Sequence, residues 1–345
     1  MPGKGFKIAL MITLIFVVII AAVLMMPGGQ RKTVVVYTSV DQVYSEPVFR
    51  DFEDRTGIQV LPVYDVEATK TTGLVNRLIA EKSHPQADVF WCAEFSQMIL
   101  LKNQSILARY QSPSGNDIPP QYHDRDGFWT GVGGRGRVFI VNTDLLKPGG
   151  YPESVFDMLD PRYPGSSIGI AYPMFGTTAT QAAALYSTLG REKAYGFYDN
   201  LSRRGVRVVD GNSVVKDLVS SGQLSFGLTD TDDACTAIAD GKHVTVVIPD
   251  QRAGEIGTLV IPDTTALIND APHPGEGRVF IDYLLSRDTE GRLVRAGWIQ
   301  IASRDLSEKV PCLNGTSIRP MAVNYQDIYE GIAMTKTDLA EIFVR

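Results

Sequence analysis

Residues 33–64, TVVVYTSVDQVYSEPVFRDFEDRTGIQVLPVY, decide the fold. Residues 34–38 are a run of β-branched and aromatic side chains, which predicts a buried strand. Residues 44–55 repeat apolar side chains at helical spacing, and Gly57 follows where a helix commonly ends in a left-handed glycine. Residues 58–64 predict a second strand. The expected apolar face of the helix consists of Val48, Phe49 and Phe52.

The same alternation continues to residue 91. Residues 71–81 predict another helix, and residues 87–91 predict a third strand. A β-α-β-α-β order predicts a parallel sheet with helices on both faces. The first part of the chain is therefore expected to be an α/β unit.

A glycine-rich segment, Gly131 to Arg137, separates this unit from the strand expected at residues 138–141. Four glycines within seven residues give the backbone unusual freedom. The segment is either a hinge that leads into a second lobe or a solvent-exposed loop. It is neither a Walker loop nor a dinucleotide-binding fingerprint, because the spacing fits neither motif.

A second α/β unit follows the glycine-rich segment. Its expected strands are residues 167–172, 206–209, 224–229 and 244–249, and its expected helices are residues 178–189, 191–204, 213–220 and 232–239. Residues 260–262 resemble a return crossing, and helices at 274–285 and 289–296 would rejoin the first unit. A chain of this length exceeds one ordinary core. We expect lobe 1 to comprise residues 33–136 and 262–304, and lobe 2 to comprise residues 137–261 and 305–345.

The N-terminus carries a targeting signal. Lys4 and Lys7 precede an uncharged apolar run over residues 8–26. Residues 1–32 are therefore expected to be either a cleaved signal peptide or an uncleaved membrane anchor that forms a hydrophobic helix. Positive charge before the run keeps that end cytoplasmic, so the body of the protein is expected outside the inner membrane.

Composition narrows the classes of partner. Beyond residue 31 the chain has 30 basic and 39 acidic side chains, which argues against a nucleic-acid partner. The three cysteines, Cys92, Cys235 and Cys312, form no CxxC pair, so a zinc or redox motif is not supported. At most one disulfide can form, and the simpler interpretation is three small buried residues.

Polar residues that follow the expected strands form a first candidate site. In open α/β sheets, ligands bind beyond the carboxyl ends of the strands. Gly176, Thr177 and Thr178 open one helix and Asn212 opens another, so free backbone N–H groups and hydroxyls could hold an anion there. The alternative is plain N-capping, which explains the same residue types.

Acidic residues form a second candidate site. Asp230, Asp232 and Asp233 lie within four residues, while Asp41 and Glu94 end strands of the other lobe. If the lobes face each other, these carboxylates repel one another unless a cation lies between them. Oxygen ligands suit a hard metal ion, and they suit an ammonium group equally. The alternative explanation is that two acids merely favour the first turn of a helix.

Arginines beside the glycines form a third candidate. Arg135 and Arg137 could clamp an anionic part of a ligand, and they could equally be surface residues. No nucleophile–base pattern accompanies them, since no HExxH or GxSxG motif occurs in the sequence. We therefore expect a binding protein and not an enzyme.

Several segments resemble the ferric-iron-type substrate-binding proteins of ABC transporters. They are VVVYTSVDQ and FRDFEDRTGIQV near the start, QADVFWCAEF, GGRGRVFIVNT, GNSVVKDLVSSGQLSFGLTD and GRLVRAG. The resemblance covers roughly residues 33–304. It implies a type II-like periplasmic-binding-protein fold, with two α/β lobes that close on a ligand in a central cleft. It also implies an ABC permease and its ATPase as partners, a periplasmic location and a monomer.

The resemblance also implies a site. The family's iron ligands are a histidine and a glutamate from one lobe and two adjacent tyrosines from the other. These positions correspond to Asp41, Glu94 and the pair Asp232 and Asp233 in this chain, so the phenolates are replaced by carboxylates. The family's synergistic anion corresponds to Gly176, Thr177 and Asn212.

We therefore expect a receptor for a small cationic ligand, with ferric iron or another hard metal ion as cargo and no resident cofactor. Relatives that bind polyamines or aminoalkylphosphonates make an amine-bearing solute the first alternative. A membrane-tethered ligand sensor is the second.

Overall fold

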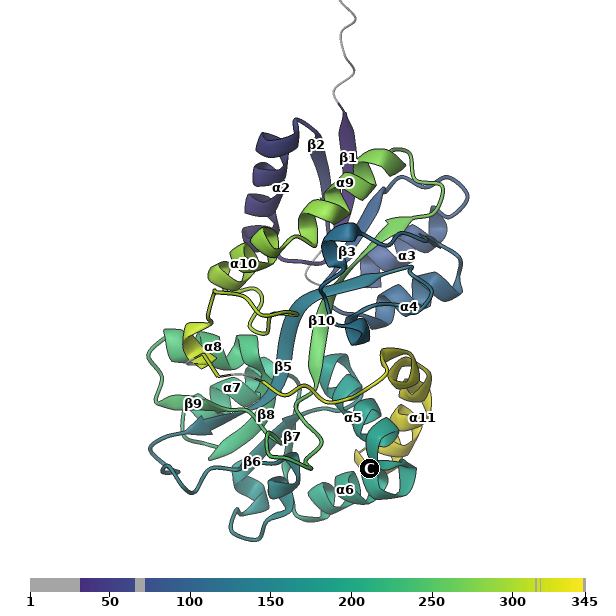
Figure 1. Ribbon diagram of the computed structural model, residues 1–345. Helices are drawn as coiled ribbons and strands as arrows, with labels where there is room; N and C mark the ends of the chain where they lie inside the picture. The colour runs from purple at the N-terminus through teal and green to yellow at the C-terminus, as the bar shows by residue number, and fades with distance from the viewer. Residues whose placement is uncertain (1–31, 66–71, 314, 317, 344–345) are drawn as a thin grey trace, which may run out of the picture.

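The computed structural model describes residues 32–65, 72–313, 315–316 and 318–343. The predicted hydrophobic helix at residues 8–26 lies outside the described residues. Within the described ranges, no helix is both long and apolar enough to cross a membrane. Figure 1 shows two lobes joined by two long strands, β5 and β10, which confirms the two-lobed α/β prediction.

The first lobe is built on a parallel sheet. Strand β1 (Thr33–Thr38) pairs in parallel with β2 (Gln59–Tyr64) and with β3 (Val89–Cys92). The connecting helices are α2 (Gln42–Thr56), α3 (Thr72–Ala80) and α4 (Ser96–Asn103). Gly57 takes a left-handed φ of 70° and donates its N–H to the carbonyl of Glu53, as expected for a helix-ending glycine. The predicted apolar face of α2, Val48, Phe49 and Phe52, is buried.

The glycine-rich segment is part of strand β5 (Thr130–Asn142). Its first half pairs with β10 (Val260–Ile268), and its second half pairs with β8 (Phe226–Asp230) and β9 (Val244–Val247). The solvent-loop alternative is therefore wrong, and β10 is longer than the predicted crossing. Glycine is needed because a Cβ on Gly134 would lie 2.2 Å from the carbonyl oxygen of Ile261.

The second lobe continues the sheet beyond β5. Strand β8 pairs in parallel with β6 (Ile168–Ala171), which pairs with β7 (Arg207–Val209). Its helices are α5 (Gly176–Leu189), α6 (Arg191–Arg203), α7 (Asn212–Ser220) and α8 (Thr231–Ala239). The strand order of the whole path is β2-β1-β3-β10-β5-β8-β6-β7, with β4 (Leu107–Ala108) beside β10 and β9 beside β5.

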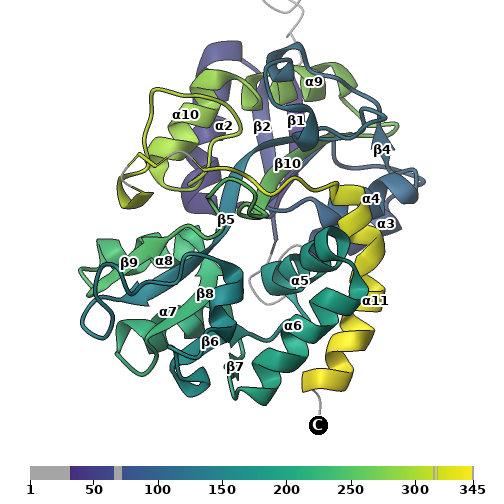
Figure 2. The ribbon, with the colours of Figure 1, turned by 60° about the horizontal axis from the view of Figure 1, so that its bottom comes forward.

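The C-terminal part divides between the lobes. Helices α9 (Pro274–Leu284) and α10 (Arg287–Ala296) pack against elements of the first lobe. Helix α11 (Tyr325–Phe343) packs on α5 and α6 in the second lobe (Figure 2). The exact lobe boundaries at residues 136 and 261 stay a prediction, because β5 runs through the first boundary and β10 through the second.

The described residues between 298 and 321 belong to a segment that runs across the junction of the lobes. Arg304, 8% exposed, donates to the buried carboxylate of Glu290 on α10 at 2.7 Å. Further along, Cys312 forms a disulfide with Cys235 on α8. The interpretation of three unpaired buried cysteines is therefore wrong for these two, while Cys92 is buried and free. The segment is thus fastened to the first lobe by an ion pair and to the second by a covalent bond.

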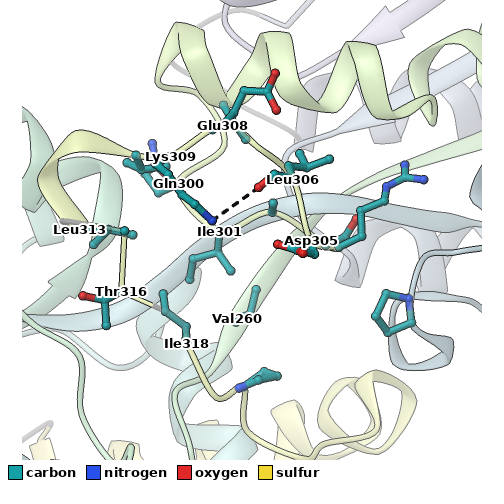
Figure 3. Close-up of a pocket in the computed structure, with 18 of the residues that line it drawn as sticks. Val260, Gln300, Ile301, Asp305, Leu306, Glu308, Lys309, Leu313, Thr316 and Ile318 are labelled. Atoms are coloured by element: carbon teal, nitrogen blue, oxygen red, sulfur yellow. Dashed lines mark hydrogen bonds between the residues drawn. The ribbon is translucent and has the colours of Figure 1, made fainter.

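A cavity of about 540 Å³ lies between this segment and β10 (Figure 3). Val260 and Ile301 line its apolar part, and Asp305, Glu308 and Lys309 lie among its polar residues. None of the predicted site residues contributes to it. The cavity is therefore distinct from the candidate site at the strand ends.

Candidate functional site

Three helices of the second lobe begin where strands of its sheet end. Helix α5 follows β6, α7 follows β7 and α8 follows β8. Their N-cap residues, Phe175, Gly211 and Asp230, make no side-chain capping hydrogen bond. Thr177, Thr178 and Asn212 lie inside the first turns rather than at the caps, so plain N-capping does not explain them.

Arg137 ties these first turns together. Its Nη1 donates to Asp230 Oδ1 at 2.7 Å, and to Thr177 Oγ1 and Asn212 Oδ1 at 3.1 Å each. Its Nη2 donates to Thr178 Oγ1 at 3.4 Å. The structure therefore brings together the polar residues predicted to hold an anion, around a cationic side chain from β5.

Asp230 is the acceptor at the centre of this network. Its Oδ2 receives the Thr177 hydroxyl at 2.7 Å and the Asn212 amide at 3.0 Å. The Arg137 side chain is 1% exposed, so its interpretation as a surface residue is wrong. A buried carboxylate and a buried guanidinium thus compensate each other, and three helix N-termini converge on the pair.

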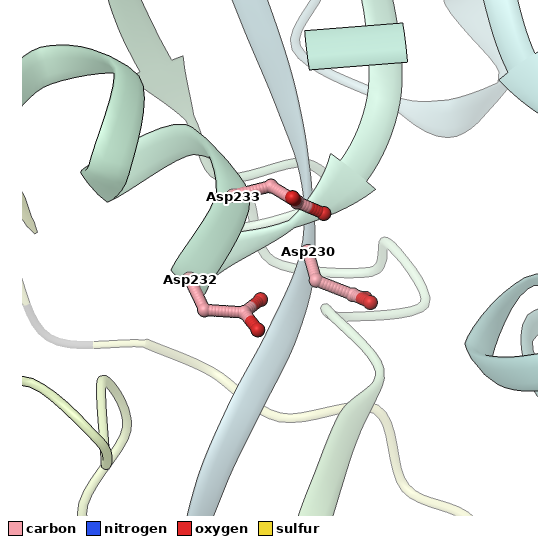
Figure 4. A group of neighbouring side chains, drawn as sticks. All are labelled: Asp230, Asp232 and Asp233. Carbon is pink, nitrogen blue, oxygen red and sulfur yellow. The ribbon is translucent and has the colours of Figure 1, made fainter. Parts of the chain in front are cut away.

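An acidic cluster adjoins the network. Carboxylate oxygens of Asp230, Asp232 and Asp233 lie within 4.8 Å of one another (Figure 4). Burial, together with the charges of Asp232 and Asp230, raises the pKa of Asp233 to about 7. Burial also raises the pKa of Asp232, against the lowering effect of Arg135. Carboxylates this close repel one another when they are ionised, so the cluster is suited to a cation.

Arg135 links this cluster to the first lobe. Its Nη1 donates to Asp232 Oδ2 at 3.2 Å, and its Nη2 donates to the carbonyl of Ala93 at 2.9 Å. Ala93 immediately precedes Glu94 at the end of β3. Arg135 thus contacts residues of both lobes from its position on the shared strand β5.

The first-lobe acids do not join the cluster directly. Asp41 precedes α2, and the Glu94 carboxylate accepts the Ser96 hydroxyl at 2.7 Å. Among the described residues, Asp230 rather than Asp41 or Glu94 completes the group around Asp232 and Asp233. The predicted set of Asp41, Glu94, Asp232 and Asp233 is therefore not assembled as one metal-ligand group, and its role in binding stays a prediction.

Sequence reasoning missed Asp263. This residue lies on β10, is 3% exposed and accepts a hydrogen bond from Trp298 Nε1. Burial raises its pKa to about 7 despite Arg135, and the charges of Asp232 and Asp41 add to the rise. One signal was available in the sequence, because Asp263 is a lone acid within the strand VIPDTTALI.

Comparison with known proteins identifies the family. The model of the bacterial extracellular solute-binding protein family matches residues 86–311, well over half of the chain. The chain belongs to this family. The ferric-binding relatives described next confirm the resemblance seen in the sequence.

Curated relatives of this solute-binding protein differ in their named ligands. An "Fe(3+)-binding periplasmic protein" of Serratia marcescens is 27% identical over 195 residues, which is 56% of each chain. A "Putative 2-aminoethylphosphonate-binding periplasmic protein" of Salmonella typhimurium is 24% identical over 282 residues, which is 79% of each. The match to the Serratia protein thus covers little more than half of that relative.

Solved structures share the fold. Apo ferric ion-binding protein A of Pasteurella haemolytica is 19% identical with a TM-score of 0.77, and the match covers 90% of this chain and 98% of that one. A Trichodesmium protein in complex with iron and citrate is 19% identical with a TM-score of 0.81, and the match covers 91% and 100%. At this identity the likeness establishes the two-lobed fold of the solute-binding protein and nothing about its ligand.

The pKa of Asp233 predicts how the stability of the solute-binding protein depends on pH. Because folding raises this pKa to about 7, the folded chain keeps a proton that the unfolded chain releases from about pH 4 upward. The contribution of Asp233 to stability is therefore lost as the pH rises through 7.

The variant Asp233→Asn tests this prediction. It keeps an acceptor for the Thr229 hydroxyl, which lies 3.1 Å from the carboxylate in the wild type. We expect the free energy of unfolding of the wild type to fall, relative to this variant, between pH 4.5 and 8 in urea titrations. Parallel pH profiles would show that Asp233 does not titrate in this range.

Proposed function

We propose that this protein is the extracytoplasmic receptor of an ABC importer, and that it binds a small cationic solute between the lobes. The acidic cluster is the observation that carries the proposal. Carboxylate oxygens of Asp230, Asp232 and Asp233 lie within 4.8 Å of one another, and burial raises the pKa of both Asp232 and Asp233. A cation that approaches these oxygens relieves their mutual repulsion.

The neighbouring helix N-termini support an anionic group next to the cation. Helices α5 and α7 begin without side-chain caps, and Arg137, whose charge is compensated by Asp230, holds their first turns together. Uncapped N–H groups together with the helix dipoles favour an anion. Gly176, Thr177, Thr178 and Asn212 are therefore the residues that we assign to the anionic part of the ligand.

Two classes of cation fit the carboxylates. A hard metal ion such as ferric iron takes oxygen ligands, and the Serratia relative supports it as cargo. The ammonium group of a polyamine or an aminoalkylphosphonate donates hydrogen bonds to the same oxygens, and the Salmonella relative supports this class. In both cases domain closure would bring Asp41 and Glu94 toward Asp232 and Asp233.

The partners follow from the proposed transport role. A monomeric receptor in the periplasm would deliver its ligand to an ABC permease with its ATPase. The sensor alternative needs the same ligand site together with an anchor at residues 8–26. The two roles are separated by reconstituting the protein with a candidate ABC permease and its ATPase, because only a transport receptor would stimulate ATP hydrolysis when it carries ligand.

We expect a cation or an amine to raise the thermal midpoint of the protein, and Asp232→Asn with Asp233→Asn to remove that rise. A ligand at one hundred times its Kd stabilises the folded state by about 2.7 kcal/mol, which thermal shift detects readily. The probes are ferric citrate, manganese, calcium, spermidine and 2-aminoethylphosphonate. The charge-matched control is Asp217→Asn with Asp240→Asn, which lie outside the cluster. An unchanged Kd in the first double variant would remove the site assignment.

A further inference from the structure

Arg135 occupies the acidic site in a way that leaves hydrogen-bonding groups unused. Its guanidinium meets Asp232 through a single bond, Nη1 to Oδ2 at 3.2 Å, rather than through a paired, two-bond contact. Asp232 Oδ1 and Arg135 Nε are both buried without a hydrogen-bond partner. A contact that leaves one acceptor and one donor unsatisfied is readily exchanged for a better one.

The surroundings keep Arg135 positively charged. Burial alone would lower the pKa of Arg135, but Asp232, Asp230 and Asp263 raise it well above the usual range. Asp263 approaches from β10 and is held by Trp298, while Asp41 and Asp232 act on Asp263 from the two lobes. The guanidinium therefore stays protonated among acids of both lobes.

Three other oxygens of the cluster are already engaged. Asp230 Oδ1 accepts a hydrogen bond from Arg137. Asp230 Oδ2 accepts hydrogen bonds from Thr177 and Asn212. The hydroxyl of Thr229 donates a hydrogen bond to Asp233 Oδ2. A hard metal ion needs six or more oxygen ligands and must lose bound water to gain them. The guanidinium offsets part of the negative potential of the carboxylates that would otherwise compensate for this loss.

We propose that Arg135 is the protein's own cation in the ligand site, and that it selects an organic ammonium ligand over a metal ion. The ligand's ammonium group replaces Arg135 on Asp232 and gains the vacant Oδ1. Arg135 keeps its contact with the first lobe through the carbonyl of Ala93, and its Nε becomes available to the anionic part of the ligand. This inference rests on the proposed cation site and names the class of solute that the site takes.

Asp263 is the positioning residue of this arrangement. It contacts Trp298 and acts on the ligand site through the charge of Arg135. Asp263→Asn keeps an acceptor for Trp298 Nε1 and removes the negative charge that Asp263 carries above about pH 7, so binding is measured at pH 8.5. Arg135 then has one acid fewer to balance it and holds Asp232 more firmly, so ammonium ligands bind more weakly.

The test compares wild type, Arg135→Gln and Arg135→Lys by calorimetry with 2-aminoethylphosphonate, spermidine, calcium and manganese. We expect the wild type to bind an ammonium probe and to bind neither metal. Arg135→Gln should gain metal affinity by about tenfold or more, and Arg135→Lys, which keeps the charge, should not. Arg203→Gln, an exposed arginine on α6, controls for the loss of one positive charge. Circular dichroism verifies that each variant is folded.

Asp263→Asn supplies a second measurement that does not depend on metals. It should weaken ammonium binding in the wild-type background and have no effect in the Arg135→Gln background, since its action passes through Arg135. Equal effects in both backgrounds would overturn the positioning role. Tight metal binding by the wild type, or an unchanged metal affinity in Arg135→Gln, would overturn the selection by Arg135 while leaving the cation site intact. If no probe binds any variant, the proposed function fails, and this inference fails with it.

Discussion

Replacing Arg137 by methionine is expected to lower the free energy of unfolding by about 3–5 kcal/mol, because it leaves Asp230 buried without its counter-charge. Asp230 is 4% exposed, and Arg137 Nη1 is its charged partner at 2.7 Å. Methionine fills much of the same volume, so the loss is electrostatic more than steric. The remaining bonds to Asp230 come from Thr177 and Asn212, which are neutral.

Urea-induced unfolding of the ligand-free protein at pH 7.5, followed by circular dichroism, measures this loss. The matched control combines Arg137→Met with Asp230→Asn, which removes both charges. This double variant should recover much of the free energy of unfolding that the single variant loses. A buried carboxylate without its counter-charge destabilises the folded state more than the removal of both charges does. A loss below about 1 kcal/mol in the single variant would mean that solvent reaches Asp230 and that the network is not closed.

Loss of the disulfide between Cys235 and Cys312 is expected to have an effect of similar size. The bond closes a loop with a sequence separation of 77. A disulfide that closes a loop of this length lowers the conformational entropy of the unfolded chain, which stabilises the folded state by about 4.5 kcal/mol at 25 °C. Cys235 is on α8, the helix whose first turn carries Asp232 and Asp233, and Cys312 is in the segment that Arg304 fastens to α10. The bond therefore restrains the acidic cluster relative to the first lobe.

The variant with Cys235→Ser and Cys312→Ser should unfold at lower urea concentration, and wild type treated with a thiol reductant should match it. Cys92→Ala is the control, since this buried free cysteine takes no part in the bond. It should keep the sensitivity to reductant. If reductant leaves the unfolding of the wild type unchanged, the two cysteines are not joined in solution.

The secondary structure was largely readable from local pattern. The apolar spacing of α2, the glycine that ends it and the strands on either side were predicted within about two residues. The glycine-rich segment remained ambiguous as a sequence, because glycine allows both loops and closely approaching strands. The pairing with β10, which comes more than 100 residues later, decided that it is a strand.

The candidate site, too, was only partly predictable from the sequence. Position after a strand identified Thr177, Asn212 and Asp232 as candidates, because the direction of a strand fixes which end faces a ligand. Position could not show that Arg137 is buried against Asp230, or that Asp263 lies near Arg135. Those relations join residues that are far apart in the chain. The first depends on the pairing of β5 with β8, and the second on the pairing of β5 with β10.

By itself, the sequence determined the alternation of strands and helices, the acidic and polar residues at the strand ends, and the family resemblance. These are properties of residue type and spacing along the chain. Only the tertiary structure decided which charges meet, that Cys235 pairs with Cys312, and that Arg135 lies among the carboxylates. The reason is physical: burial and pairing depend on distances between segments, and packing of the two lobes around the shared strands sets those distances.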